Sequence, residues 1–412
     1  MLKNYYTFIN FKVVCFGIIL LSIYIMPITT HAQEITIYVD NHYGNNNNTG
    51  LDQKAPMKDI HTAIKKLSDK GGRIILVSDY IIAEYSQLNE YKHEKTITIS
   101  SKDNSKLYFS NCGEYILNGP TVFSGINIYC DGSAYIYANF NPITFADNVK
   151  INSKNDLRTM NIYGGFKEYT ENSPTDLDSH ISIYSGDMFA TVVGFTKSKG
   201  TQNTTFTGTS YINIYGGNIS KIIGGCVDAH MTETTQINVY GGKIGSIYTG
   251  GNLLRCTNNA SVNIFGGETG TLNINNVLKS ANILLKSGVV NDINLSYQTA
   301  NIHDKAIEFS ITLEYNDSVF PSSLIDDLKL SANFYGLDLT VNNIKLETET
   351  DATQNTTIDI IPPQEFSETG TQSIHITEDN NPPEKNLSYI VYLSIFLLSL
   401  ISLVGIMKFK NK

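Results

Sequence analysis

The sequence predicts an all-β protein built as a parallel β-helix, and two observations support this fold class. The first is a repeat: Ile212-Asn-Ile-Tyr-Gly-Gly217 returns as Ile237-Asn-Val-Tyr-Gly-Gly242 and as Val262-Asn-Ile-Phe-Gly-Gly267, 25 residues later each time. A fixed period of this size is typical of stacked repeats, whose units complete their cores only against their neighbours. The second is the alternation of apolar and polar residues within each copy, which indicates a half-buried strand that ends at a Gly-Gly bend.

Each repeat contains a second short strand. It reads Ile219-Ser-Lys-Ile-Ile-Gly-Gly225 in one copy and Ile244-Gly-Ser-Ile-Tyr-Thr-Gly250 in the next. A helix is excluded because β-branched residues and glycines recur too densely, and an antiparallel meander would need turns about every 8 to 12 residues. Both strands fit one coil of a β-helix, in which equivalent residues of successive coils lie about 4.8 Å apart and form ladders. Weaker copies begin at Met160, Ile181 and Ala281.

Ladders of like side chains are expected on both faces of the repeat strands. The core-facing residues are Ile212, Ile214, Ile237, Val239, Val262 and Ile264. The outward ladders supply the candidate ligand-binding residues, which are Tyr163, Tyr184, Asn213, Tyr215, Asn238, Tyr240, Asn263 and Phe265, with Asn161 and Asn282 as extensions. Two interpretations remain open: stacked amides and rings stabilise in-register parallel strands, and a flat Tyr/Asn strip can also stack against sugars. The chain contains no Trp, which weakens the second interpretation.

The β-helix is expected over residues 33–302, and a helix from Met57 to about Ser68 is expected near its start. The apolar residues of this helix follow the spacing of one buried face: Ile60, Ala63, Ile64 and Leu67. Gly71-Gly72 ends the helix. Such a helix suits the open end of a β-helix because it would cover the strand edges and the apolar interior of the first coil.

This region resembles the N-terminal cap of the right-handed parallel β-helix proteins of the pectin lyase-like superfamily. The residues that carry the resemblance are Ile37-Tyr-Val-Asp40, Asn48-Thr-Gly50, Pro56, Ile60-His-Thr-Ala-Ile64 and Gly71-Gly-Arg-Ile-Ile-Leu-Val77. Later coils look like those of large bacterial surface proteins of this superfamily, and the resemblance covers about residues 35–300. It implies the fold rather than an activity, because this fold includes lyases, hydrolases, epimerases and inert adhesins.

The motifs that the resemblance would imply for an enzyme are not found within the coils. The weak catalytic candidates are Asp176, Asp178, His180 and Asp187, with a second group of Asp228, His230 and Arg255 on adjoining loops. Carboxylates and an imidazole can serve as acid and base or hold Ca²⁺, and plain surface polarity is the alternative interpretation. No metal and no cofactor are assigned.

Charge and cysteine usage limit the partners and the cross-links. The net charge of −9 and the pI near 5.4 exclude nucleic acid as a partner, because no basic stripe would contact phosphates. Four cysteines remain beyond the first 32 residues, and the local pairings are Cys112 with Cys130 and Cys226 with Cys256. Other connectivities and free thiols remain open.

Residues 1–32 have the pattern of a secretory signal peptide. Lys3 and Lys12 are followed by an apolar run from Val13 to Met26 and by the small-residue site Thr30-His-Ala32. This order of charged, apolar and small-residue regions predicts export and removal of the segment. An uncleaved membrane anchor is the alternative interpretation.

The C-terminal residues predict a single membrane span. A linker (379–387), an apolar helix (388–407) and a basic tail (408–412) follow one another. About 20 apolar residues match a hydrocarbon core of about 30 Å, and lysines favour the cytoplasmic side. The expected location is therefore the cell membrane, with an extracellular ectodomain. Sortase-type wall anchoring is the alternative, although Pro382-Pro-Glu-Lys-Asn386 keeps only the proline of the Leu-Pro-x-Thr-Gly pattern.

The repeat gives way to a different pattern after about Ile302. Gly-Gly pairs disappear, and alternating strands are expected at Ile307–Leu313, Leu337–Val341, Asn343–Thr348 and Thr356–Ile361. We expect a small immunoglobulin-like β-sandwich stalk over 303–378.

The leading functional hypothesis is a bacterial cell-surface protein whose β-helix acts as a non-catalytic, adhesin-like module for a glycan or a surface protein. One alternative is a polysaccharide lyase or glycoside hydrolase acting on an acidic polysaccharide, and another is a passive envelope spacer. The oligomeric state stays open at this stage.

Overall fold

The computed structural model describes residues 34–82, 91–154, 160–167, 173–196, 206–227, 232–251, 257–296, 310–316, 320–335 and 337–343. All of them belong to the first of two units, Met1–Glu347. The predicted signal peptide, linker, membrane helix and basic tail lie outside the described residues. No helix in the described ranges is long and apolar enough to cross a membrane.

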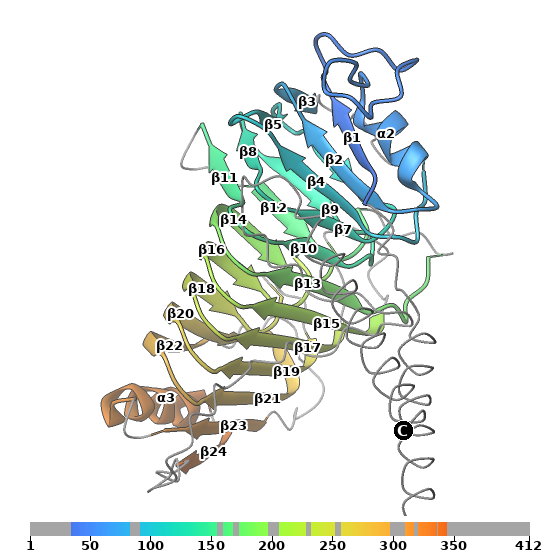
Figure 1. The fold of residues 1–412 in the computed structure, drawn as a ribbon. Helices are drawn as coiled ribbons and strands as arrows, with labels where there is room; N and C mark the ends of the chain where they lie inside the picture. The colour runs from blue at the N-terminus through green and yellow to red at the C-terminus, as the bar shows by residue number, and fades with distance from the viewer. Residues whose placement is uncertain are drawn as a thin grey trace, which may run out of the picture. The chain divides into compact units, whose positions relative to one another are not determined.

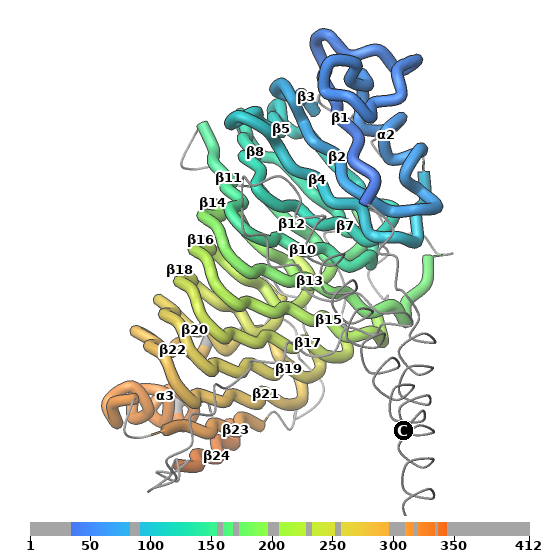
Figure 2. Tube along the Cα trace, viewed as in Figure 1, coloured from blue at the N-terminus to red at the C-terminus, as the bar shows by residue number. Residues whose placement is uncertain are grey.

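Parallel strands form two long sheets, which we call sheet A and sheet B (Figures 1 and 2). Sheet A contains, in spatial order, β1 (Thr36–Val39), β2 (Gly72–Leu76), β4 (Ile97–Ser101), β7 (Thr121–Phe123), β10 (Ile143–Phe145), β13 (Ser179–Ile183), β15 (Phe206–Ile214), β17 (Thr232–Val239), β19 (Thr257–Ile264), β21 (Val277–Leu285), β23 (Ser310–Tyr315) and β24 (Asp338–Asn343).

Sheet B contains the strands that lie between the sheet A strands along the chain. Its main path is β3 (Tyr80–Ile82), β5 (Lys106–Phe109), β8 (Asn127–Cys130), β11 (Lys150–Ser153), β14 (Asp187–Val193), β16 (Asn218–Ile223), β18 (Lys243–Tyr248), β20 (Glu268–Asn275) and β22 (Val289–Ser296). A branch contains β6 (Glu114–Ile116), β9 (Ala134–Tyr137) and β12 (Met160–Tyr163). Because the chain alternates between the sheets, the architecture is compatible with the predicted parallel β-helix.

The core lies between the sheets, and the register of the repeat is the predicted one. Ile212 pairs with Ile237, and Ile237 pairs with Val262. The predicted core ladder is confirmed, since all of its members are fully buried: Ile212, Ile214, Ile237, Val239, Val262 and Ile264. The Gly-Gly bend joins the two sheets, and Gly242 adopts a φ of +87° there, which a side chain would disfavour.

The predicted N-terminal helix is present as α2 (Ile60–Leu67). Asp59 caps it by accepting a hydrogen bond from the Thr62 backbone N–H at 2.7 Å. Its four buried residues, Ile60, Ala63, Ile64 and Leu67, are those expected from the helical spacing, and they join the main core. The helix ends as predicted, because the Gly71 N–H bonds to the Leu67 carbonyl while Gly71 has a φ of +70°.

Sheet B changes its form at β14. The start of β14 pairs with β11, and its later residues pair with β12, so one long strand replaces two short ones. The pairing of β14 with β16 shifts between Met188 and Thr191. In β16 the buried residues Ile219 and Ile222 are three apart, so the two residues between them face outward and the strand bends.

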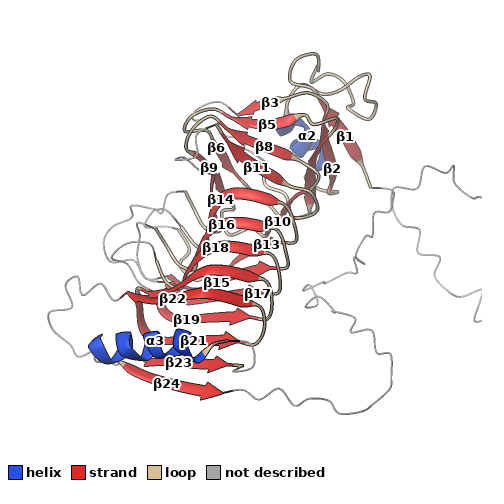
Figure 3. Ribbon diagram, turned by 90° about the vertical axis from the view of Figure 1, so that its left-hand side faces the viewer, coloured by secondary structure: helices blue, strands red, loops and turns tan. Residues whose placement is uncertain are grey.

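The region after residue 302 differs from the expected β-sandwich. β23 pairs in parallel with β21, and β24 pairs in parallel with β23, so sheet A continues to Asn343. Between them runs the helix α3 (Ser322–Tyr335), which contacts β22 (Figure 3). For these two strands the expected sandwich is wrong, because period-2 alternation marks a half-buried strand without specifying parallel or antiparallel partners. The rest of the expected stalk, 344–378, lies outside the described residues.

The helix α3 has an apolar face that the sequence analysis missed. Leu324, Ile325, Leu328 and Ala332 are buried and belong to the same core as the solenoid. Their spacing is helical and could have identified this segment. α3 therefore covers apolar surface near the last described coils, as α2 does at the first coil.

We predict that Ile237→Ala destabilises the solenoid by about 2–5 kcal/mol, because it removes buried methyl groups and leaves a cavity between two well-packed coils. Gln236→Ala, at the neighbouring half-buried position, is the control and should cost less than about 1 kcal/mol. Urea unfolding of both variants would measure the difference, and equal losses would contradict the assignment of Ile237 to the core.

Candidate functional site

Four aromatic residues form a continuous row on sheet A, which we call the aromatic ladder: Tyr184, Tyr215, Tyr240 and Phe265. Each follows directly after a sheet A strand. Successive ring centroids are 4.5, 5.0 and 5.1 Å apart, and the ring planes differ by only 12°, 6° and 15°. The predicted alignment of these four residues is therefore present in the structure.

The ladder presents ring edges more than ring faces. Both faces of Tyr215 and of Tyr240 are stacked against neighbouring rings, so a ligand would meet their edges and hydroxyls. Tyr184 and Tyr240 are 41% and 39% exposed. Burial, with a smaller effect of Tyr184 and Tyr240, raises the pKa of Tyr215 to about 12, so its hydroxyl stays protonated at neutral pH. The surface thus offers a row of four ring edges, three of which carry a hydroxyl.

The asparagine ladder runs beside the aromatic one. Asn238 Nδ2 donates to Asn213 Oδ1 at 2.8 Å, and Asn263 Nδ2 donates to Asn238 Oδ1 at 2.8 Å. Asn238 is only 7% exposed. Each amide keeps further hydrogen-bonding capacity after these contacts, because an amide has two N–H groups and two acceptor lone pairs. The ladder therefore stabilises the stacked coils first, and its end members are the ones better placed to meet a ligand.

Three predicted ladder members lie elsewhere. Tyr163 belongs to β12 in sheet B, is 3% exposed and stacks on Tyr137 at 5.2 Å, and Asn161 lies on the same strand. Asn282 pairs with Ser261, whereas Asn263 lies opposite Leu284, so Asn282 does not continue the asparagine ladder. The local pattern of Met160–Gly165 identified a strand but could not tell on which side of the coil it lies. Asn282 stands six residues before Gly288, whereas Asn263 stands four before Gly267, so two additional residues shift Asn282 by one outward position.

A stacked pair of rings next to the ladders was missed by the sequence analysis. His180 stacks on Tyr211 with centroids 4.9 Å apart and an angle of 2°. Loss of water around the imidazole lowers the pKa of His180, although the negative charge of Asp178 acts in the opposite direction. The sequence contained a signal for this stacked pair. His180 and Tyr211 lie four residues before Tyr184 and Tyr215, so they align in the same register.

The acidic candidates do not converge on one site. Asp178 accepts a hydrogen bond from the Thr209 N–H at 2.7 Å near sheet A, and Asp176 is exposed in the same segment. Asp187 begins β14 in sheet B. Asp228, His230 and Arg255 lie outside the described residues. In the part of the chain that the structure describes, no group of three or more His, Cys, Asp or Glu side chains could hold a metal ion.

The predicted disulfide between Cys112 and Cys130 is not formed. Cys112 and Cys130 are both free thiols, as is the buried Cys226, whereas Cys256 lies outside the described residues. Cys130 pairs in register with Phe109 and is buried in the core, while Cys112 lies in a turn with a φ of +59°. Proximity in sequence suggested this bridge, but the register turns Cys130 towards the core.

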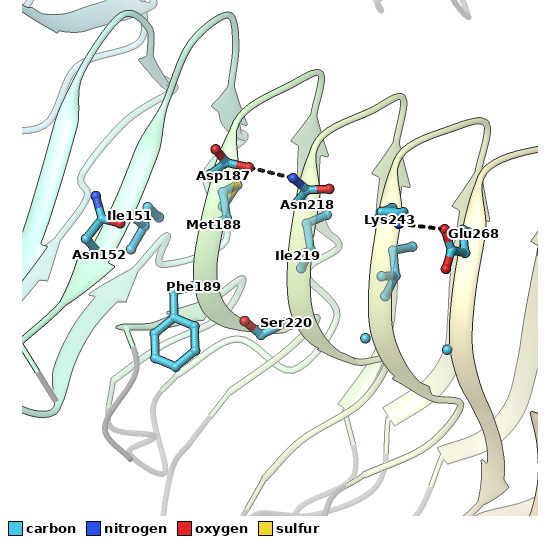
Figure 4. Close-up of a pocket in the computed structure, with 13 residues that line it drawn as sticks. Ile151, Asn152, Asp187, Met188, Phe189, Asn218, Ile219, Ser220, Lys243 and Glu268 are labelled. Atoms are coloured by element: carbon cyan, nitrogen blue, oxygen red, sulfur yellow. Dashed lines mark hydrogen bonds and ion pairs between the residues drawn. The ribbon is translucent and has the colours of Figure 1, made fainter. Parts of the chain in front are cut away.

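Sheet B carries a groove of about 520 Å³ (Figure 4). One edge is formed by Asp187, Asn218, Lys243 and Glu268, and the floor includes Phe189, Ser220, Gly245 and Gly270. Asn218 Nδ2 donates to Asp187 Oδ1 at 2.5 Å, and Lys243 Nζ lies 2.9 Å from Glu268 Oε2. Of these residues only Asp187 was a predicted candidate. The other edge residues could have been identified from the sequence, because each one directly follows a glycine of the repeat.

No protein-family model matches the chain, and no curated protein or solved structure was found to match it. The function must therefore be inferred from these surfaces.

We predict that Asn238→Ala lowers the free energy of unfolding by about 1–3 kcal/mol, because it removes the central amide and leaves half-buried partners on both sides without it. Gln236→Ala on the same strand is the control. Chemical denaturation gives both values, and equal small effects would mean that the amide ladder contributes nothing.

We predict that alkaline pH destabilises the aromatic ladder. Since the pKa of Tyr215 is about 12 in the folded protein and near 10 in the unfolded chain, the unfolded state loses the proton first. The stabilisation is complete below pH 10 and is lost as the pH rises towards 12. Thermal unfolding at about pH 9 and pH 11 should show a smaller loss in Tyr215→Phe than in the unaltered protein; identical losses would contradict the assignment.

Proposed function

We propose that the protein is a bacterial cell-surface protein that binds a glycan or another surface protein without catalysis, through the aromatic and asparagine ladders of sheet A. The observation that carries the proposal is the aromatic ladder, because it repeats a ring edge on four successive coils and a hydroxyl on three of them. A polymer lying along the solenoid would meet a tyrosine hydroxyl on three successive coils, about 5 Å apart. Carbohydrates carry hydroxyls at regular intervals and fit such a row.

The location and the superfamily are part of the same proposal. The signal-peptide pattern of residues 1–32 and the apolar segment 388–407 support a single-pass membrane protein with an extracellular solenoid. The cap motifs, together with α2 and the parallel sheets, support a right-handed member of the pectin lyase-like superfamily.

The alternative of a polysaccharide-cleaving enzyme has less support among the described residues. The groove on sheet B has two carboxylates on its edge, Asp187 and Glu268, and they lie three strand spacings apart, roughly 14 Å. Glycoside hydrolysis by a carboxylate pair needs a separation of about 5–9.5 Å. A cluster that includes Asp228 or Arg255 would involve residues outside the described ranges.

We predict that Tyr184→Ala combined with Tyr240→Ala weakens glycan binding by about 5- to 150-fold, because two hydrogen-bonding groups of about 0.5–1.5 kcal/mol each are removed. Glycan-array binding of the full chain would identify the ligand, and titration would give the ratio. Tyr43→Ala is the matched control, since Tyr43 is 84% exposed in the N-terminal turns, away from the ladder.

The same polysaccharides should be tested for new reducing ends and unsaturated products. Binding without product supports the proposal. Product formation would overturn it in favour of an enzyme, and neither binding nor product would favour the passive spacer.

A further inference from the structure

One edge of the groove on sheet B and the neighbouring Lys150, which lies in register with it, carry a pattern of charge. Successive strands place Lys150, Asp187, Asn218, Lys243 and Glu268 in register, and we call these residues the charged stripe. Strand spacing separates neighbours by about 4.8 Å. Four of the residues are exposed, and the Glu268 side chain keeps 43% of its surface in solvent. The charges read positive, negative, neutral, positive, negative along the solenoid.

The charged stripe is complementary to itself when one copy is reversed. If two copies face each other antiparallel about Asn218, Lys150 lies opposite Glu268 of the second copy. Asp187 then lies opposite Lys243, and Asn218 lies opposite its own equivalent. A parallel arrangement would place each charge opposite a like charge. A slip by one coil would also bring like charges together, either Asp187 with Glu268 or Lys150 with Lys243.

The side chains on the groove floor differ in size, and their order is also complementary in the antiparallel arrangement. Phe189 is a half-buried aromatic residue one coil before Ser220 (Figure 4). The strand register places Gly245 one coil after Ser220. In the same antiparallel arrangement Phe189 of each copy stands over Gly245 of the other. The hollow at Gly245 is required by the backbone, because a Cβ there would lie 2.5 Å from the Ser220 carbonyl oxygen.

We propose that two copies of the chain pair antiparallel through the outer face of sheet B, with a two-fold axis at Asn218. Such a pairing is isologous, so each contact occurs twice. Burial of Phe189 supplies most of the affinity, because exposed ion pairs contribute little by themselves. The charged stripe sets the orientation and the register, since wrong arrangements meet like charges. The aromatic ladder lies on sheet A and takes no part, so this proposal and the proposed function can fail independently.

The pairing can be tested with two complementary charge variants of the full chain. Asp187→Lys alone places two lysines opposite each other, and Lys243→Asp alone places two aspartates opposite each other. We expect at least about a tenfold weaker self-association for each variant in sedimentation velocity, and recovery as a heterodimer when the two are mixed. A folding defect could not be rescued by mixing.

Lys54→Asp is the matched control, since it makes the same charge change on an exposed lysine of the N-terminal turns and should leave the dimer intact. A full chain that stays monomeric at about 100 µM, or a mixture that does not recover, would overturn the proposal.

Cross-linking gives a second, independent test of the axis. In Asn218→Cys the new thiols of the two copies face each other, so oxidation with diamide should yield a covalent dimer. In Lys150→Cys, on the same charged stripe, the thiol faces Glu268 instead, and little dimer should form. Equal cross-linking of both variants would contradict the antiparallel register.

Discussion

In-register hydrogen bonding between parallel strands of successive coils is the constraint on which the rest of the structure depends. It places Ile212, Ile237 and Val262 in one buried line and repeats the same geometry on both sheets. Because each outward position is aligned in the same way, any side chain that recurs in the repeat becomes a row on the surface. The ladders of sheet A and the charged stripe of sheet B are both results of this alignment.

Most of the solenoid could be predicted from the sequence because its repeat combines a fixed period with strand alternation. The core ladder, the helix α2 and the alignment of Tyr184 to Phe265 all follow from local pattern plus stacking. Tyr163 shows the limit of this reasoning, since a similar strand sequence occurs on both sides of the coil. Only the partners of a strand, which are distant in sequence, decide to which sheet it belongs.

The end of the solenoid and the groove on sheet B were harder to predict for different reasons. Ser310–Tyr315 kept its alternation but lost the Gly-Gly pair, so it looked like the start of another domain although it adds a strand to sheet A. The charged stripe contains different residue types at each coil, so it produces no sequence repeat. Four of its five residues directly follow a glycine, so they become visible only when this position is compared across coils, and Lys150 is found only from the strand register.

The stacking of similar coils between the helices α2 and α3 also determines how such a protein can change its length. Each coil contacts mainly its neighbours, so duplication of a 25-residue unit would add about 4.8 Å without altering α2 or α3. The aromatic ladder would tolerate the extra unit and simply gain a member. Duplication of the Asn218 coil would also leave the charged stripe complementary to its own reverse, because Lys150 would still face Glu268 and Asp187 would still face Lys243. The two-fold axis of the proposed pair would then lie between the two copies of Asn218.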